Sequence, residues 1–308
     1  MGKIAFVFAG QGAQYPGMGK ALYESSAAAR AVFDAAEKER PGTLAQCFEG
    51  DKDTLSRTLN TQPCLYAVDL ACARALEEQG VRADACAGFS LGEIAAAAFS
   101  GLLAEDDAMR LVCRRAELMD ACSQGRSVAM AAVLRLTAQQ VEALCDKYPD
   151  VYPVNYNCPG QTVVSGDAAQ IDALINDVTA LRGRAMKLAV SGAFHSPYMH
   201  EAAVGLSDYM LMRGLRLSAH HLPLYANCTA QPYGDDAEEL LARQVESPVL
   251  WEKTVRNMLA DGVDAFVECG AGKTLSGLIK KIAPEATVCR VEDPVTLMET
   301  LTTLGGRS

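Results

Sequence analysis

The segment Gly88-Phe89-Ser90-Leu91-Gly92 places a serine between two glycines, where an apolar run ends and an alanine-rich run begins. This pattern predicts a sharp turn from a buried strand, residues 83–89, into a helix, residues 91–99. Glycine on both sides of the serine avoids the Cβ atoms that would crowd such a turn. The turn lifts a serine hydroxyl off the sheet and aims the next backbone N–H at an oxyanion, so Ser90 is a candidate nucleophile.

The rest of the chain alternates short apolar runs with segments of helical spacing, which predicts an α/β fold with a mainly parallel sheet. The expected strands are residues 4–8, 83–89, 222–226, 265–268 and 287–291. The expected helices are residues 62–78, 91–99, 106–122, 198–211, 240–245, 251–259, 275–282 and 295–304. In the first of these helices, Thr61 is the expected cap and Pro63 lies in the first turn.

The middle of the chain follows a different order. Strands are expected at residues 128–134, 151–156, 162–165 and 185–190, with helices at 137–147 and 168–180. The resulting order βαββαβ is the ferredoxin-like pattern. We therefore expect a small domain of residues 126–191, inserted into a discontinuous large domain of residues 1–125 and 192–308.

Composition excludes several classes of function. The net charge of −10 over 308 residues disfavours bulk attraction to nucleic acid or to an anionic membrane. No apolar run approaches the roughly 18 residues of a membrane span. The 11 cysteines include no C-x-x-C pair and lie mostly in apolar runs, as expected for reduced thiols in the cytoplasm. The 4 histidines lack metal-ligand spacing, so no metal site is expected.

Arg115 lies in the middle of the apolar face of the helix expected at residues 106–122, whereas Arg110 and Arg114 project elsewhere. Two interpretations stay open. The guanidinium either extends past the core or pairs with a structural carboxylate, or it binds a substrate carboxylate through two parallel hydrogen bonds. The position of Arg115 one helix after Ser90 favours the second interpretation.

His195 lies where the inserted segment returns to the large domain, between small residues and Pro197. A lone histidine is usually a surface residue or a satisfied core residue, but hinges between domains are where functional residues concentrate. The loop Gly10–Gln14 after the first strand lacks the third glycine of a dinucleotide site, because Tyr15 stands there. Such a loop can instead present backbone N–H groups to an oxyanion.

These segments together resemble the malonyl-CoA:acyl-carrier-protein transacylases of bacterial fatty-acid synthesis, which are related to the acyltransferase domains of polyketide synthases. The resemblance covers essentially the whole chain and implies a larger, α/β-hydrolase-like domain with the ferredoxin-like insert. It rests on Phe8–Gln14, Gly88–Glu93, Cys113–Met119, Asn155–Gln161, Phe194–Pro197, Gln244 ahead of Ser247–Val249, and Glu268–Lys273, all in the order typical of the family.

The resemblance implies a role for each catalytic position. Ser90 would carry the malonyl ester, and His195 would be its general base and then its general acid. The main-chain carbonyl of Gln244 would hold the histidine in place of an aspartate. The backbone N–H groups of Gln11 and Leu91 would form the oxyanion hole.

The resemblance also implies the substrate contacts and the reaction. Arg115 would bind the malonyl carboxylate, and Phe194 would fill the space that an α-methyl group needs; Gln62 and Gln161 are further substrate-binding candidates. Malonyl-CoA would acylate Ser90, and the phosphopantetheine thiol of holo acyl carrier protein would then accept the group. We expect a cytoplasmic monomer without cofactor, nucleic-acid partner or membrane partner.

Two other enzyme classes and one binding class remain as alternatives. A stand-alone acyltransferase of a polyketide pathway shares the chemistry and differs in its partner. A serine thioesterase or hydrolase of the α/β-hydrolase type normally places its histidine late in the chain, but no histidine follows His221. A non-catalytic scaffold for carrier proteins predicts a missing serine or histidine, and both are present.

Overall fold

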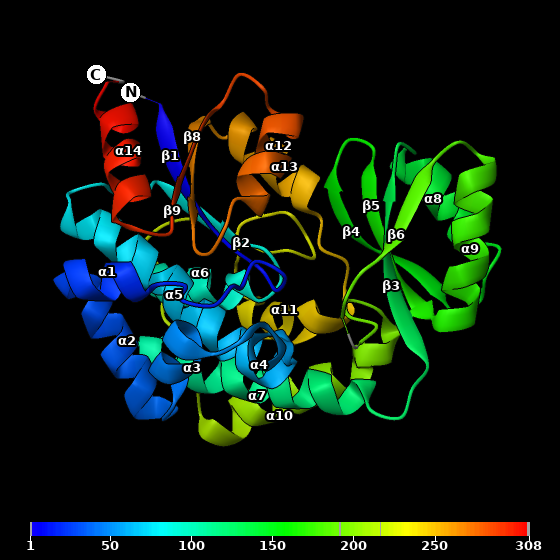
Figure 1. The fold of residues 1–308 in the computed structure, drawn as a ribbon, viewed down its shortest axis with the longest axis horizontal. Helices are drawn as coiled ribbons and strands as arrows, with labels where there is room; N and C mark the ends of the chain where they lie inside the picture. Colours follow the sequence, from blue (N-terminus) through cyan, green and yellow to red (C-terminus); the bar gives the residue numbers. More distant parts are fainter. Residues whose placement is uncertain (1, 191, 216, 307–308) are drawn as a thin grey trace.

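The computed structural model describes residues 2–190, 192–215 and 217–306, and Figure 1 shows its two sheets side by side. The larger sheet consists of β1 (Lys3–Phe8), β2 (Ala85–Gly88), β7 (Leu224–Tyr225), β8 (Val263–Cys269) and β9 (Thr287–Val291). The smaller sheet consists of β3 (Val128–Leu134), β4 (Val151–Cys158), β5 (Gln161–Asp167) and β6 (Arg184–Lys187).

The helices surround the larger sheet and cover one face of the smaller one (Figure 1). They are α1 (Lys20–Ser25), α2 (Ala27–Glu39), α3 (Thr43–Glu49), α4 (Lys52–Ser56), α5 (Thr58–Glu78), α6 (Gly92–Phe99), α7 (Glu105–Ser123), α8 (Ala138–Cys145), α9 (Ala168–Ala180), α10 (His200–Arg213), α11 (Ala237–Arg243), α12 (Trp251–Ala260), α13 (Thr274–Ile282) and α14 (Pro294–Gly305), with 3₁₀ turns at Pro197–Met199 and Gln244–Glu246.

The larger sheet has the strand order β7-β2-β1-β8-β9, and its strands pair in parallel, as predicted. Successive side chains of central β1 enter different cores: Phe6 and Phe8 pack in the cluster that contains α5 and α6, and Val7 packs in the cluster of α12 and α13. Phe8 is in register with Gly88 on one side and with Cys269 on the other. The carboxyl ends of β1, β2 and β8 therefore meet at one edge, where ligands bind in sheets of this kind.

The smaller sheet has the order β4-β5-β3-β6 with antiparallel pairs, and the element order βαββαβ is confirmed. Alternate residues of β3 face different cores. Ala131 and Val133 pack with α8 and α9, which lie on the side away from the larger sheet (Figure 1), and Met130 and Ala132 join the main core. The small sheet is thus packed on both faces.

Main-chain hydrogen bonds join β4 of the smaller sheet to Val249, which lies just before α12. The N–H of Val249 donates to the carbonyl of Val154 at 2.8 Å, and the N–H of Tyr156 donates to the carbonyl of Val249 at 2.9 Å. The structure confirms a mixed α/β fold with a parallel and an antiparallel sheet. The likeness to α/β hydrolases and the domain limits at residues 125–126 and 191–192 stay predictions, and Ser191 lies outside the described residues.

Two features of the N-terminal part differ from the sequence prediction. Helices α1–α4 were not predicted, and three of them have only 5 to 7 residues, too short for a periodic pattern to emerge. The prediction of Thr61 as a helix cap was wrong, because α5 begins at Thr58. The Thr61 hydroxyl donates to the carbonyl of Arg57 at 3.0 Å, so it lies inside the first turn. This start places Gln62 within the helix and fully buried.

Candidate active site

Ser90 lies on the turn between β2 and α6, as the glycine pattern predicts. Its φ of 54° is in the left-handed region, which a residue with a side chain rarely adopts. A Cβ at Gly88 would lie 1.9 Å from the carbonyl carbon of Gly92, and a Cβ at Gly92 would lie 2.3 Å from the carbonyl oxygen of Phe8. Gly88 is therefore required by the tightness of the turn itself, and Gly92 by the close approach of the turn to the end of β1.

His195 is buried and its Nε2 lies 2.7 Å from the Oγ of Ser90. On the other side of the ring, Nδ1 lies 3.0 Å from the carbonyl oxygen of Gln244 and 3.1 Å from that of Ser247. A carbonyl oxygen only accepts hydrogen bonds, so Nδ1 carries the proton and Nε2 is the free acceptor that faces the serine hydroxyl. This is the tautomer that a general base needs.

The protonation state of His195 follows from its surroundings. Burial, with the positive charge of Arg115 as the second cause, lowers the pKa of His195 to about 4. The imidazole is therefore neutral at neutral pH and able to accept a proton from Ser90. The loop that carries the histidine is held by a hydrogen bond from the His195 N–H to the carbonyl of Val245 at 2.9 Å.

Arg115 of α7 reaches Ser90 from a third direction and is 1% exposed. Its Nη1 donates to Oε1 of Gln62 at 2.8 Å, and its Nη2 donates to Oε1 of Gln244 at 2.8 Å and to Ser90 Oγ at 3.2 Å. Its Nε has no hydrogen-bond partner in the described part of the chain. A buried cation surrounded by neutral groups is a site for an anionic ligand.

Burial lowers the pKa of Arg115 to about 10, and the buried Glu93 carboxylate opposes this shift. Arg115 is therefore still a cation at neutral pH. The two amide oxygens around it, from Gln62 and Gln244, supply hydrogen bonds without cancelling its charge. The structure thus excludes, for Arg115, both an extended surface position and a direct ion pair with a carboxylate among the described residues.

Gln244 contacts all three of these residues. Its main-chain carbonyl faces His195, its Oε1 accepts from Arg115, and its Nε2 donates to the carbonyl oxygen of Ser90. Gln244 is the first residue of the 3₁₀ turn Gln244–Glu246 and is buried. One residue therefore aligns the base and the cation with the serine.

The loop after β1 packs directly on the serine turn. A Cβ at Gly10 would lie 2.7 Å from the carbonyl oxygen of Phe89, so Gln11 follows a point of close contact with the turn. Among the described residues, no acceptor occupies the backbone N–H of Gln11 or of Leu91. Both N–H groups are therefore free to donate to a further acceptor.

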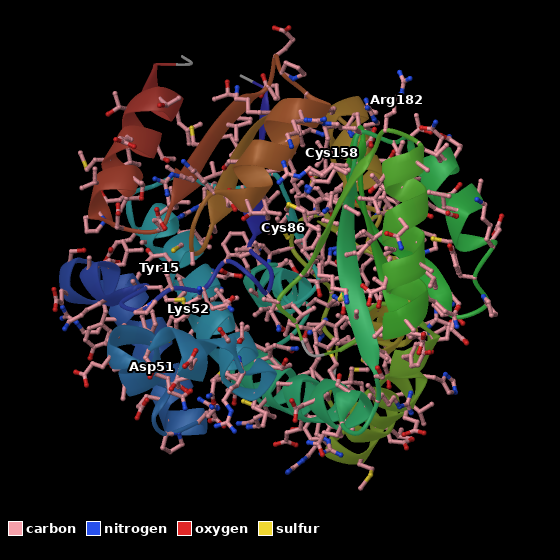
Figure 2. All side chains as sticks on the ribbon, turned by 45° about the vertical axis from the view of Figure 1, so that its right-hand side comes forward. Tyr15, Asp51, Lys52, Cys86, Cys158 and Arg182 are labelled. Carbon is pink, nitrogen blue, oxygen red and sulfur yellow. The ribbon has the colours of Figure 1, made fainter. Side chains whose placement is uncertain are left out.

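Two predicted substrate residues occupy different places. Phe194 is 6% exposed and packs over Gly192, where a Cβ would lie 2.4 Å from the phenyl ring. Gln161 pairs with Cys158 at the β4–β5 turn, and its Oε1 accepts from Nζ of Lys281 at 3.3 Å. Figure 2 shows Cys158 toward the upper end of the small sheet, with Arg182 at the same end. The contacts of Gln161 are thus separate from those of Arg115.

Three buried polar residues at the site were not predicted: Asn227, Glu93 and Tyr233. The side chain of Asn227 accepts from the Ser90 N–H at 2.7 Å, and Glu93 accepts from the Tyr233 hydroxyl at 2.6 Å. The available signal for Asn227 was its position directly after a predicted strand, residues 222–226, at the edge where parallel strands end. Glu93 stood within the Gly88–Glu93 segment but was given no role of its own.

Two other kinds of feature are absent from the residues that the structure describes. Within residues 2–190, 192–215 and 217–306, no group of three or more His, Cys, Asp and Glu side chains is arranged to hold a metal ion. None of the helices in those ranges combines the length and apolarity that crossing a membrane requires.

A serine on a strand-to-helix turn, a neutral histidine and an open pair of N–H groups are the components of acyl transfer through an ester. Comparison with known families agrees, because residues 5–293 match the family described as "Acyl transferase domain". The chain is therefore an acyltransferase.

Similar proteins and structures show which kind of acyltransferase the chain is. The chain is 37% identical over 313 residues to the malonyl CoA-acyl carrier protein transacylase of Bacillus subtilis, with 99% of this chain and 98% of the relative covered. The crystal structure of the transacylase from Clostridium perfringens superposes with a TM-score of 0.95 at 35% identity, covering 99% of this chain and 98% of that one. The chain belongs to the malonyl CoA-acyl carrier protein transacylase family.

A third similar structure is a malonyl-transacylase in complex with a type II polyketide synthase acyl-carrier protein. It has a TM-score of 0.93 at 29% identity and covers 98% of this chain and 99% of that chain. The chain therefore shares its fold with an enzyme that binds its acyl-carrier protein directly.

Proposed function

We propose that this enzyme transfers a malonyl group from malonyl-CoA to the phosphopantetheine thiol of holo acyl carrier protein through an ester on Ser90. The observation that carries the proposal is the contact of a buried guanidinium, that of Arg115, with the Oγ of Ser90 at 3.2 Å. A hydrolase for simple acyl groups gains nothing from a cation there. A malonyl group brings a carboxylate, which a guanidinium binds through two charge-assisted hydrogen bonds.

In the loading step, Nε2 of His195 takes the Ser90 proton while Oγ attacks the thioester carbonyl carbon. The new C–O bond leaves an oxyanion, which the N–H groups of Gln11 and Leu91 stabilise; such a donor is worth about 3 kcal/mol. When the intermediate collapses, the C–S bond breaks and the histidine returns its proton to the sulfur of CoA. The malonyl ester of Ser90 remains.

In the discharge step, the thiol of the carrier protein replaces CoA. His195 takes the thiol proton, the sulfur attacks the ester carbonyl, and the C–O bond to Ser90 breaks as the proton returns to Oγ. The carboxylate stays on Arg115 through both steps and accepts from guanidinium N–H groups other than those that donate to Gln62 and Gln244, among them the unpartnered Nε. Both half-reactions thus use one set of groups, as ping-pong transfer requires.

The remaining predicted residues act in specificity. Phe194 fills the space next to His195 that an α-methyl group needs, and its burial supports this role. Gln62 aligns Arg115 for the carboxylate. Gln161 lies beside Lys281, so we assign it to the pantetheine or nucleotide part of CoA and not to the malonyl end.

The proposed setting is fatty-acid synthesis in the cytoplasm, with a monomer that uses no cofactor, since the thioester supplies both the acyl group and the leaving group. A polyketide pathway is the second candidate, because one similar structure holds a polyketide synthase carrier protein. Transfer rates to carrier proteins of the two kinds distinguish these settings.

Initial-rate kinetics test the proposal. With malonyl-CoA and holo carrier protein varied together, double-reciprocal plots are expected to be parallel, and Ser90→Ala is expected to abolish transfer. Intersecting lines would show direct transfer without an ester, and release of free malonate faster than transfer would assign the chain to the thioesterases.

A further inference from the structure

The side chain of Asn227 spans the turn that carries the nucleophile. Its Oδ1 accepts a hydrogen bond from the N–H of Ser90 at 2.7 Å, and its Nδ2 donates to the carbonyl oxygen of Gly88 at 2.6 Å. The residue is 1% exposed and lies two residues after the end of β7, the strand next to β2. One amide therefore binds the backbone on both sides of Phe89.

These two bonds meet a specific need of the turn. The left-handed φ of Ser90, 54°, ends the ladder of β2, so the N–H of Ser90 and the carbonyl of Gly88 have no neighbouring strand to pair with. Buried backbone groups without partners are strongly unfavourable. An asparagine side chain offers one acceptor and one donor in a plane, and here it supplies both partners.

The same bond determines which N–H faces the substrate. Because the N–H of Ser90 already donates to Asn227, it is not free to donate to an oxyanion. The N–H of Leu91 is left without an acceptor among the described residues. The amide of Asn227 thus fixes both the direction of the nucleophile and the choice of Leu91 as oxyanion donor.

Asn227 is itself held from two sides. Its N–H donates to Oε1 of Glu93 at 2.9 Å, and its carbonyl accepts from the N–H of Leu250 at 2.9 Å. Glu93 is fully buried in α6, one turn after Ser90, and its Oε1 also accepts from the Tyr233 hydroxyl at 2.6 Å. The contacts form a closed ring that runs from the serine turn through α6 and Glu93 to Asn227 and back to the turn.

We propose that Asn227 is a positioning residue for Ser90, and that Glu93 holds Asn227 in register with the turn. Asn227 acts through the backbone of Ser90 and Gly88. The proposal rests on the function proposed above, in which Ser90 is the acylated residue. It predicts a loss in the rate of ester formation without a matching loss in substrate binding. Arg115 is held by Gln62 and Gln244, and none of these three side chains has a hydrogen bond to Asn227 among the described residues.

The test compares Asn227→Ala with Asn257→Ala in the full-length enzyme. Asn257 is a matched control, since its Nδ2 also donates to a main-chain carbonyl, that of Ala230 at 2.6 Å, and it has no hydrogen bond to the serine turn among the described residues. The first measurement is the pre-steady-state rate of Ser90 loading by malonyl-CoA, together with KM. The second is inactivation by phenylmethylsulfonyl fluoride, which reports on Ser90 without using Arg115.

We expect Asn227→Ala to slow loading and inactivation by about 100-fold, the loss typical of a nucleophile displaced by about 1 Å. KM for malonyl-CoA should stay within about threefold, as expected when substrate contacts are unchanged. Asn257→Ala should load at the wild-type rate. Loading of folded Asn227→Ala at the wild-type rate would overturn the proposal, as would an equal loss in Asn257→Ala.

A second pair of variants keeps the proposal testable if Asn227→Ala does not fold. Glu93→Gln retains an Oε1 that can accept from Asn227 and Tyr233, whereas Glu93→Ala removes it. Glu93→Ala should load about 10-fold more slowly than Glu93→Gln, because it removes the acceptor of two hydrogen bonds, from the Asn227 N–H and the Tyr233 hydroxyl. Equal rates for the two variants would contradict the role of Glu93. If wild-type enzyme forms no ester on Ser90, the proposed function fails instead.

Discussion

The Oγ of Ser90 lies 3.2 Å from Nη2 of Arg115, so the nucleophile and the buried cation are in direct contact. An acyl group on Ser90 therefore starts next to a positive charge. A short chain that ends in a carboxylate can bend back to the guanidinium, whereas an uncharged chain leaves it buried without an anionic partner. This single contact joins the chemistry of ester formation to the choice of acyl group.

Replacement of Arg115 by alanine tests this relationship. Each hydrogen bond to a charged group contributes about 1.5–3 kcal/mol, and two such bonds to the malonyl carboxylate amount to a factor of at least about 100 in kcat/KM. Arg115→Ala should lose this factor with malonyl-CoA and gain activity relative to wild type with acetyl-CoA. Transfer of each acyl group to holo carrier protein is the measurement.

Arg114→Ala is the matched control, because Arg114 is the neighbouring residue of α7 and pairs with Glu117 at 2.9 Å on the surface. It should keep the malonyl preference. If Arg115→Ala transfers malonyl as fast as Arg114→Ala does, Arg115 does not bind the carboxylate.

Gln62 is predicted to act on binding more than on the rate of chemistry. Its Oε1 accepts from Nη1 of Arg115 at 2.8 Å, and no hydrogen bond joins its side chain to Ser90 or His195 among the described residues. Gln62→Leu should raise KM for malonyl-CoA about 10-fold, as expected for one charged hydrogen bond of at least 1.4 kcal/mol, with kcat within about threefold.

The control for Gln62→Leu is Gln124→Leu, since the exposed Gln124 contacts only Asp120 at 3.1 Å among the side chains described. Steady-state measurement of kcat and KM for both variants tests this prediction. A fall in kcat without a change in KM would place Gln62 in the chemical step instead.

The pH dependence of loading should reflect the low pKa of His195. Burial lowers that pKa to about 4, and only the neutral imidazole accepts the Ser90 proton. As pH falls from about 7 to about 5, the loading rate should stay nearly constant, and it should decline only as pH passes through about 4. Stopped-flow mixing into buffers of low pH gives the rate before the protein unfolds.

Glu93→Gln serves as the control for that profile, since burial raises the pKa of Glu93 to about 7 and its titration could otherwise be mistaken for that of the histidine. A decline centred near pH 6.5 in both proteins would show that His195 has an ordinary pKa.

Glu93 should make stability depend on pH. Its pKa rises from 4.5 in the unfolded chain to about 7 in the folded protein, so the folded state binds the proton more tightly. The stabilisation by this proton is present below pH 4.5 and is lost as pH rises through about 7, by up to about 3 kcal/mol. The free energy of unfolding in urea, wild type minus Glu93→Gln, should fall accordingly between pH 5 and about 8. A difference independent of pH would contradict the assignment.

The candidate site was predictable where it depends on local pattern. The glycines around Ser90 and the position of Arg115 on an apolar helix face are both properties of a few consecutive residues, and the structure brings the two side chains into contact. The βαββαβ segment was predictable for the same reason, because its strands and helices follow simple periods.

The rest depends on contacts between distant parts of the chain. Asn227 bonds to Ser90 across 137 positions, and a single asparagine after a two-residue strand carries no periodic signal. The two carbonyls that orient His195 belong to a 3₁₀ turn and the residue after it, whose geometry follows from packing rather than from residue type. Helices α1, α3 and α4 are short and stabilised mainly by the core they cover.

Intact-protein mass spectrometry after mixing with malonyl-CoA tests the central claim most directly. The account predicts a covalent malonyl adduct that peptide mapping places on Ser90, absent from Ser90→Ala, and removed by holo carrier protein faster than by water. Wild-type enzyme that transfers malonate without this adduct, or an adduct that water removes as fast as the carrier protein does, would contradict it.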